Sequence, residues 1–269
     1  MTDIAIGIVG CGGRMGRTLI RQVTQTAGCA LSGGTEAEGH DALGKDLGLL
    51  AGLEQEMGQI ATTDRQALFE ASDVVIDFTV PETTALLAGL AAETNTAHIV
   101  GTTGLDEDQA RAITDAAQKT VVVQAANFSL GVNLLMALTR QVAQTLDPQF
   151  DIEVLEMHHR HKVDAPSGTA LALGHAAAEG RGVDLNAVAD RVRDGITGAR
   201  KEGDIGFATL RGGNVVGDHS VIFAADDERI ELSHKAGDRT IFARGAVHAA
   251  QWAHGQAPGY YTMADVLGF

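Results

Sequence analysis

The run Ile4-Ala5-Ile6-Gly7-Ile8-Val9 passes directly into Gly10-Cys11-Gly12-Gly13-Arg14-Met15-Gly16-Arg17, and this junction decides the fold. The first segment is a short apolar run, typical of a buried parallel strand. The second contains Gly10-x-Gly12-x-x-x-Gly16, and residues 18–23 then have a helical pattern. Glycines between a strand and a helix permit a tight turn and bring backbone N–H groups against a pyrophosphate. The junction predicts a dinucleotide-binding unit, although its spacing departs from strict GxGxxG.

An acidic residue follows the second predicted strand. The segment Cys29-Ala30-Leu31-Ser32-Gly33-Gly34 has strand character and ends at Thr35-Glu36. In dinucleotide-binding units, an acid at this place holds the adenosine ribose. Glu36 is therefore a candidate cofactor contact, and the alternative is an ordinary surface glutamate.

Strands and helices continue to alternate after Glu36. Strands are predicted at 74–78, 97–100 and 121–123, and helices at 81–93 and 106–118. This βαβ series implies a doubly wound parallel sheet, in which ligands bind at the carboxyl ends of the strands. The small, polar strand ends Gly101-Thr102-Thr103 and Ala125-Ala126-Asn127 are therefore expected on the nicotinamide side, unless they only form turns.

The pattern changes after Phe128. Residues 130–146 predict one long helix, and residues 205–210, 215–223 and 229–234 predict strands separated by turns. Residues 186–203 are polar and Gly-rich and are predicted to be a loop, whereas 238–252 return to helical spacing. We expect an α/β protein: a Rossmann-like, doubly wound domain from 1–127 plus 236–269, and an α+β domain with a mixed sheet, for substrate binding and oligomerisation, from 128–235. An uncovered sheet face or edge favours oligomerisation.

Composition limits the class of protein. The 269 residues are 45% hydrophobic but only 4% aromatic, and the formal net charge is −15. The acidic balance argues against a nucleic-acid partner. No cleaved leader and no long apolar run is evident, so no membrane segment is expected. Two cysteines are too few for a disulfide framework, and a cytoplasmic location is the default expectation.

The segment Glu156-Met157-His158-His159-Arg160-His161-Lys162-Val163-Asp164-Ala165-Pro166-Ser167-Gly168-Thr169 is the richest in chemistry. Five basic or protonatable groups occupy five consecutive positions in an acidic chain. A strand is predicted before them, at 150–157, and a helix after them, with Ser167 as N-cap. The N–H groups of a helix start favour a carboxylate or phosphate. A small anion site is predicted, to which Gly168 gives close backbone approach and Thr169 a hydroxyl donor.

The same segment offers proton-transfer groups. Histidine exchanges protons near neutral pH, and a lysine among other cations can act as a proton donor. Two other interpretations stay open. One is a solvated basic loop. The other is a zinc site built from the histidines, against which stand the cations Arg160 and Lys162 and the absence of a CxxC or HExxH motif.

The run EMHHRHKVDAPSGTA, taken with GCGGRMG, VIDFTVPE, GTTG, AANFS and IGFATLRGGNVVGDHSVIF, resembles the 4-hydroxy-tetrahydrodipicolinate (dihydrodipicolinate) reductase family over nearly the whole chain. The resemblance implies an oxidoreductase of lysine and diaminopimelate biosynthesis. NADH or NADPH would deliver hydride to a small cyclic dicarboxylate with loss of water, giving tetrahydrodipicolinate. It also implies a homotetramer assembled through the second domain.

The resemblance assigns roles to particular residues. His158 is implied as general acid/base and Lys162 as proton donor, whereas His159, Gly168 and Thr169 are implied as substrate contacts. No metal is implied. The implied cofactor contacts are Gly10, Cys11, Gly12, Gly13, Arg14, Met15, Glu36, Gly101, Thr102, Thr103, Ala125, Ala126, Asn127 and Phe128.

Two positions depart from family members that use NADPH well. Those members often have an arginine just after the ribose-binding acid, where this chain has Ala37, and some have a basic residue where this chain has Val80. An arginine is the natural partner of a 2′-phosphate. We therefore expect NADH to be used at least as well as NADPH, with Lys45 or Arg14 as possible substitutes for the missing cation.

Two further hypotheses remain at the level of sequence. A different two-domain nicotinamide dehydrogenase would act on an acyclic semialdehyde or keto acid, without need for a ring with two carboxylates. A non-catalytic sensor would bind the dinucleotide and regulate a partner, which the dense set of proton-transfer groups argues against.

Overall fold

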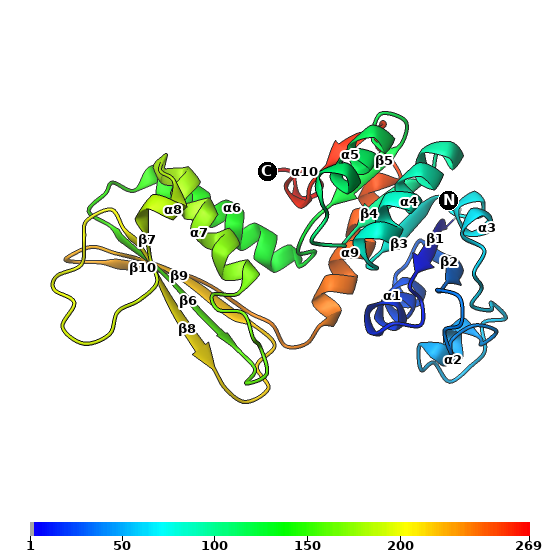
Figure 1. The fold of residues 1–269 in the computed structure, drawn as a ribbon, viewed down its shortest axis with the longest axis horizontal. Coiled ribbons are helices and arrows are strands. Elements are labelled where there is room, and N and C mark those ends of the chain that lie inside the picture. Colours follow the sequence, from blue (N-terminus) through cyan, green and yellow to red (C-terminus); the bar gives the residue numbers. More distant parts are fainter. Residues whose placement is uncertain (1–2) are drawn as a thin grey trace. The chain divides into compact units, whose positions relative to one another are not determined.

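The computed structural model describes residues 3–269, which form two compact units (Figure 1). Unit 1 comprises the described residues up to Leu130 together with Thr240–Phe269, and unit 2 is Gly131–Arg239. Each unit has its own sheet and its own hydrophobic core. Among residues 3–269, no helix is both long and apolar enough to cross a membrane.

The sheet of unit 1 is parallel throughout. Its order is β11-β5-β4-β3-β1-β2, and every neighbouring pair runs in the same direction. The predicted doubly wound sheet is thus confirmed, and the strand order reverses between β1 and β3, where such sheets bind ligands. The strands are β1 (Ile4–Val9), β2 (Cys29–Thr35), β3 (Val74–Asp77), β4 (Ala97–Val100), β5 (Val121–Gln124) and β11 (Gly259–Tyr261).

Helices cover both faces of this sheet because its strands are apolar on both sides. Ile6, Ile8 and Ile76 share one core with residues of α1 and α9, whereas Val75 and Val122 pack in the cores formed with α3, α4 and α5. The helices are α1 (Arg14–Gln25), α2 (Leu47–Leu50), α3 (Arg65–Glu70), α4 (Pro81–Thr94), α5 (Glu107–Ala116), α9 (Thr240–Ala253) and α10 (Met263–Leu267). Helix α1 begins four residues earlier than predicted, and α2, α3, α10 and β11 were not predicted from the sequence.

The sheet of unit 2 is mixed, as predicted. Its order is β10-β9-β6-β8-β7, with β9 antiparallel to both neighbours and β6, β8 and β7 parallel. The strands are β6 (Asp151–His158), β7 (Ala189–Asp190), β8 (Ile205–Arg211), β9 (Asp218–Ala224) and β10 (Arg229–Lys235). The predicted start of β9 at residue 215 is wrong: the strand begins at Asp218, which pairs with Met157 at the end of the β6 ladder.

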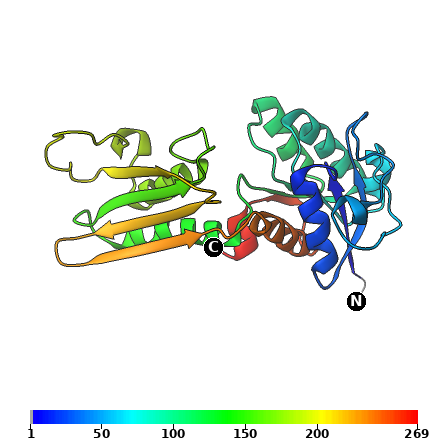
Figure 2. The same cartoon turned by 90° about the horizontal axis from the view of Figure 1, so that it is seen from below.

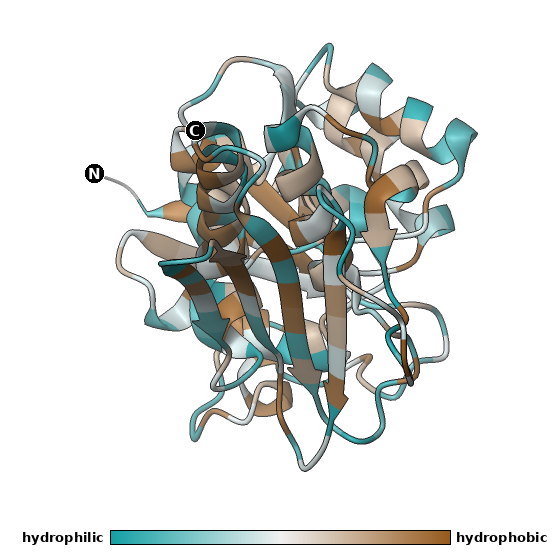
Figure 3. Ribbon diagram, turned by 90° about the vertical axis from the view of Figure 1, so that its left-hand side faces the viewer, coloured by the Kyte–Doolittle hydropathy of each residue, from teal (hydrophilic) through white to brown (hydrophobic). Residues whose placement is uncertain are grey.

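Two helices cover one face of the unit 2 sheet (Figure 2). They are α6 (Leu130–Thr145) and α7 (Gly168–Arg181), and the short α8 (Leu185–Val188) follows α7. Residues 186–203, predicted to be a loop, include the end of α8 and all of β7. Ile152, Val154 and Phe223 form the core between the sheet and these helices. Among the described residues of unit 2, no helix lies on the opposite face (Figure 3).

Candidate active site

The alternation of side chains along β6 positions the candidate catalytic histidine, His158. Side chains two apart along a strand share a face, so Ile152 and Val154 lie in the core and Glu156 and His158 follow them on the same face. All four are buried, and His158 is only 7% exposed. We predicted that His158 lies in the basic loop. That placement is wrong, because His158 is the last residue of β6 and pairs with Arg211 of β8.

Glu156 is the centre of a buried hydrogen-bond network. Its carboxylate is 1% exposed and lies 2.6 Å from Nδ1 of His158. The guanidinium of Arg211 donates to both carboxylate oxygens, at 2.7 and 2.9 Å. The backbone N–H of Ser167, at the start of α7, donates at 3.0 Å. One carboxylate therefore joins β6, β8 and α7 at the site.

These donors keep Glu156 ionised. Burial raises the pKa of the Glu156 carboxyl, but the hydrogen bonds from Arg211, His158 and Ser167 outweigh burial, and its pKa is below the ordinary value. An ionised carboxylate only accepts hydrogen bonds, so Nδ1 of His158 is the protonated nitrogen in this pair. Nε2 is consequently the nitrogen that can exchange a proton with a substrate.

The space beside this nitrogen is shaped by Gly217 and His219. A Cβ atom at Gly217 would lie 3.0 Å from Nε2 of His158, so a larger residue there would press on the reactive atom. The ring of His219 lies edge-on to that of His158, with centroids 5.0 Å apart, and its Nε2 is 3.1 Å from Oγ of Ser167. Burial, and then the charge of His158, lowers the pKa of His219 to about 4.

The remaining basic residues differ in exposure. Arg160 and His161 are exposed, whereas His159 and Lys162 are half-buried. Nζ of Lys162 lies 2.8 Å from Oδ1 of Asp164, and this bond lowers the pKa of the Asp164 carboxyl. Within the described residues, Nδ1 of His159 is buried and has no hydrogen-bond partner. Such an atom fits a ligand contact, because a buried polar group without a partner is costly.

Helix α7 begins beside this network. Ser167 is its N-cap, as predicted, and its Oγ accepts from the Ala170 N–H at 3.2 Å. A Cβ atom added at Gly168 would meet nothing within 4 Å, so the backbone there is open to a ligand. Gly168 and the partly exposed Thr169 form the first turn of the helix, and the start of a helix attracts an anion.

The glycine loop of unit 1 fits the pyrophosphate of a dinucleotide. Gly10 has a φ of +72°, and a Cβ atom at Gly16 would lie 2.1 Å from the Gly10 carbonyl oxygen. Side chains at these places would close the turn. Gly13 is the N-cap of α1 and has no side chain to occupy the N–H groups of the first turn. Those groups are therefore available to phosphate oxygens.

Glu36 lies beside this loop at the end of β2. Its carboxylate accepts from the N–H of Gly12 at 2.9 Å and from that of Ala37 at 3.1 Å. A cavity of about 330 Å³ opens here, at the carboxyl ends of β1, β2 and β3. Its lining residues are Val9, Gly10, Gly13, Glu36, Ala37, His40, Arg65, Phe78, Thr79, Val80 and Thr83.

The other predicted cofactor residues of the loop do not line this cavity with their side chains. Cys11 is fully buried, and burial together with the charge of Glu36 raises the pKa of its thiol to about 12. Met15 packs against the core, and Arg14 is exposed outside the cavity. Contacts from Cys11 would therefore come from its backbone.

The predicted strand-end residues follow the carboxyl ends of β4 and β5, which are neighbours in the sheet. Gly101 donates to the Asp77 carbonyl at 2.8 Å, and Thr102, nearly buried, accepts from the hydroxyl of Thr84 at 2.7 Å. Ala125 donates to the Val100 carbonyl. The side chain of Phe128 is buried, 5.5 Å from Phe78 between ring centroids. Thr103 and Ala126 are exposed, and Asn127 is half-buried with Oδ1 accepting from the Ser129 N–H.

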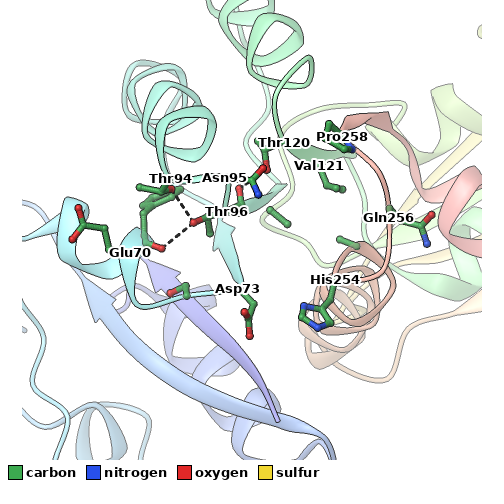
Figure 4. Close-up of a pocket in the computed structure, with 14 residues that line it drawn as sticks. Glu70, Asp73, Thr94, Asn95, Thr96, Thr120, Val121, His254, Gln256 and Pro258 are labelled. Carbon is green, nitrogen blue, oxygen red and sulfur yellow. Dashed lines mark hydrogen bonds between the residues drawn. The ribbon is translucent and has the colours of Figure 1, made fainter. Parts of the chain in front are cut away.

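A second cavity, of about 380 Å³, lies at the opposite edge of the unit 1 sheet (Figure 4). Asp73, Thr96 and Thr120 line it at the amino ends of the strands, with His254 facing them from the end of α9. The hydroxyls of Thr96 and Thr120 are already bonded to backbone carbonyls. Although this cavity is the larger of the two, ligands of parallel sheets bind at the carboxyl ends of the strands, so the cavity beside the glycine loop is the better candidate for a cofactor site.

Residues that the sequence analysis missed complete both sites. At the histidine they are Glu156, Arg211 and His219, and at the cofactor cavity His40 and Arg65. Only Glu156 had a signal in the sequence, since it lies two residues before His158 in a strand. In the part of the chain that the structure describes, no group of three or more His, Cys, Asp or Glu residues is arranged to hold a metal ion.

Comparison with known proteins identifies the family. The family model described as dihydrodipicolinate reductase, N-terminus, matches residues 4–128, and the corresponding C-terminus model matches residues 131–267. The chain belongs to the dihydrodipicolinate reductase family. The expected family, with its place among the NAD(P)-dependent oxidoreductases of lysine and diaminopimelate biosynthesis, is thereby confirmed.

Full-length relatives agree with this assignment. The 4-hydroxy-tetrahydrodipicolinate reductase of Parvibaculum lavamentivorans is 59% identical over 266 residues, which are 99% of this chain and 98% of the relative. That of Ruegeria pomeroyi is 55% identical over 269 residues, covering all of both chains. A dipicolinate-bound dihydrodipicolinate reductase from Paenisporosarcina sp. TG-14 superposes with a TM-score of 0.78 at 23% identity, over 97% of this chain and 98% of the other. That structure confirms the fold.

Proposed function

We propose that this protein reduces 4-hydroxy-tetrahydrodipicolinate to tetrahydrodipicolinate, with loss of water, and that His158 and Lys162 manage the protons. The observation that carries the proposal is the Glu156–His158 pair, at 2.6 Å, beside the open start of α7. It combines a proton-exchanging nitrogen with an anion-binding helix end. A cyclic substrate with two carboxylates requires both features.

Each residue has a distinct part in this proposal. Glu156 fixes His158 with Nδ1 protonated, so that Nε2 accepts or returns a proton during loss of water. Lys162 supplies the proton that compensates hydride addition, a contribution typically worth about 10²–10⁴ in rate. The N–H groups at Gly168 and Thr169 bind one substrate carboxylate, and the unpartnered ring nitrogen of His159 contacts the substrate.

The cofactor site is assigned to unit 1. A nicotinamide dinucleotide supplies the hydride when bound. The glycine loop would hold its pyrophosphate, Glu36 its adenosine ribose, and the strand ends at 101–103 and 125–128 its nicotinamide half. Because neither Ala37 nor Val80 offers a cation, we propose that NADH is used at least as well as NADPH.

The reaction is tested by following NADH and NADPH oxidation while the substrate is generated in place from pyruvate and aspartate semialdehyde by the preceding synthase. We expect turnover with both cofactors. His158→Gln and Lys162→Ala should each lower kcat by at least about a hundredfold with the fold retained. His254→Gln and Lys119→Ala, at exposed positions in unit 1, are matched controls that should keep full activity. Near-normal kcat in both site variants would refute the assigned roles.

We also propose a homotetramer assembled through the uncovered face of the unit 2 sheet. The strand register places Leu155, Met157 and Ala208 on this face, together with Leu210 and Ile222. Leu210 is 48% exposed, and exposed apolar side chains on an uncovered sheet face favour association. Sedimentation analysis should give the mass of four chains, and Leu210→Glu should reduce it. A monomeric wild-type protein would contradict the proposal.

A cytoplasmic location completes the proposed function. Cys11 and Cys29 are both buried as free thiols. Free, buried thiols are ordinary in reducing compartments, where biosynthetic enzymes that use NADH or NADPH also operate. Fractionation of the source cells tests this location, and recovery of the protein outside the cytoplasmic fraction would contradict it.

A further inference from the structure

The cavity beside Glu36 contains a cation that the linear sequence does not place there. Arg65 lines this cavity together with Glu36, Ala37 and His40. In residues 3–269, it is the single Lys or Arg side chain that lines it. Lys45 and Arg14, the substitutes that the sequence offered for a missing cation after Glu36, are both exposed and lie outside the lining.

Backbone pairing brings Arg65 to this place. Residue 62 forms a parallel bridge with Thr35 at the end of β2. The N–H of Glu36 donates to the Thr62 carbonyl at 2.9 Å, and the N–H of Thr62 donates to the Gly34 carbonyl at 3.1 Å. Arg65 then begins α3. The segment that carries it therefore runs beside the strand end that carries Glu36.

The start of α3 is itself fixed. Asp64 is the N-cap, and its carboxylate accepts from the Ala67 N–H at 2.9 Å. The buried Leu68 and Phe69 anchor the helix against the sheet. Arg65 is half-buried. A guanidinium on an anchored helix start is held near the cavity at a smaller entropic cost than one on a free loop.

The charges around the Glu36 carboxylate indicate which cofactor group Arg65 could bind. Glu36 stands at the position that holds the ribose hydroxyls, and its carboxylate is already oriented by the N–H groups of Gly12 and Ala37. A 2′-phosphate at the same ribose would bring about two further negative charges toward this carboxylate. It therefore needs a cation, whereas a plain 2′-hydroxyl does not. A guanidinium matches a phosphate in charge and in its forked donor geometry.

His40 is the weaker candidate for this contact. Its Nδ1 already accepts from the Ala42 N–H at 3.1 Å. Its ring also packs against the glycine loop, since a Cβ atom at Gly12 would lie 2.7 Å from Cε1 of His40. One ring nitrogen remains, without the paired donors of an arginine.

We propose that Arg65 is the cofactor-specificity residue of this protein. It would bind the 2′-phosphate of NADPH, in place of the arginine that other family members often have where this chain has Ala37. This inference rests on the proposed function, because it assumes a dinucleotide at the glycine loop. It would give NADPH a cation that neither Ala37 nor Val80 supplies, beside the proposed use of NADH. NADH, which has no 2′-phosphate, does not depend on Arg65.

Binding measurements test the inference without turnover. Isothermal titration calorimetry of the full-length protein should show that Arg65→Gln weakens NADPH binding at least about tenfold, or ~1.4 kcal/mol, and changes NADH binding less than about twofold. The fragments adenosine 2′,5′-bisphosphate and 5′-AMP should show the same contrast. The NADPH affinity of Arg65→Lys should lie between those of the wild type and Arg65→Gln, because lysine keeps the positive charge but loses the paired donors of the guanidinium. Arg111→Gln, which removes an exposed arginine on α5, is the matched control.

Each outcome decides the inference. Equal affinities of wild type and Arg65→Gln for NADPH would overturn it. So would an Arg65→Gln variant whose ratio of affinities for adenosine 2′,5′-bisphosphate and 5′-AMP equals that of the wild type. Loss of NADH binding together with NADPH binding would show that Arg65 contacts a group that both cofactors share, and would also overturn the inference. A wild type that discriminates through Arg65 but reduces no 4-hydroxy-tetrahydrodipicolinate would refute the proposed reaction and leave this inference standing.

Discussion

Replacing His219 by Gln should remove a defined part of the protein's sensitivity to acid. The His219 ring is 4% exposed and lies among His158, Glu156, His234 and Lys162. Burial and the neighbouring cations disfavour its protonated form, which lowers its pKa from 6.5 to about 4. The unfolded chain therefore binds a proton at this position that the folded chain refuses.

The direction and size of the pH effect on the free energy of unfolding follow from this difference in pKa. Because the folded pKa is the lower one, stability is unaffected well above pH 6.5 and falls as the pH drops through the interval from 6.5 to about 4. At about pH 5, nearly every unfolded chain carries the proton and few folded chains do, which costs about 2 kcal/mol relative to pH 7. Glutamine places an amide nitrogen near the position of Nε2, the atom beside Ser167, and does not titrate.

Amide hydrogen exchange read by mass spectrometry measures this effect locally. Peptides from β6 and β9 report the opening free energy of unit 2, whereas Trp252 reports only unit 1. Between about pH 7 and pH 5, the wild type should lose about 2 kcal/mol more protection than His219→Gln. His254→Gln, at an exposed position, should behave like the wild type. Equal losses in wild type and His219→Gln would refute the reasoning.

Two further predictions concern His158. Glu156→Gln should lower kcat about a hundredfold and displace the acidic limb of the pH–rate profile, because an amide neither fixes the Nδ1–H tautomer nor balances the charge of the imidazolium; an unchanged profile would contradict this. Gly217→Ala should lower kcat while unfolding is nearly unchanged, because its Cβ would lie 3.0 Å from Nε2. Gly237→Ala, whose Cβ would meet nothing within 4 Å, is its control, and equal kcat values for the two variants would argue against crowding of Nε2.

Sequence patterns predicted unit 1 well because its strands are buried on both faces. Such strands are continuous apolar runs, as in Val74-Val75-Ile76, and small polar residues mark their ends. The elements that the patterns missed are short and owe their conformation to tertiary contacts. Helix α2 has four residues, and its start is fixed by the buried carboxylate of Asp46, which accepts from the N–H groups of Gly48 and Leu49. Strand β11 has three residues and exists because it pairs with β5.

The candidate active site shows the same contrast between residues marked by a local sequence pattern and residues brought in by tertiary contacts. His158 and Lys162 are predicted site residues because five basic or protonatable residues in a row are unusual in an acidic chain. Arg211 was not found, because its contact with Glu156 spans 55 positions and depends on the register between β6 and β8. Arg65 could not be assigned for the same reason, since it reaches the cavity only through pairing of residue 62 with the end of β2.

The two ion pairs of the site differ in what a substrate can do with them. Glu156 is buried and held by Arg211 through two hydrogen bonds, so removing either partner would leave an uncompensated charge in the interior. Asp164 is 52% exposed, so solvent screens its pair with the half-buried Lys162, and a screened pair of this kind contributes only roughly 0–1 kcal/mol. If Lys162 has the proposed role, an incoming carboxylate takes it from Asp164 at little cost, while the Glu156–Arg211 pair stays intact. In the proposed mechanism, the buried pair holds the His158 ring in place, and the solvent-screened pair positions Lys162 until the substrate replaces Asp164.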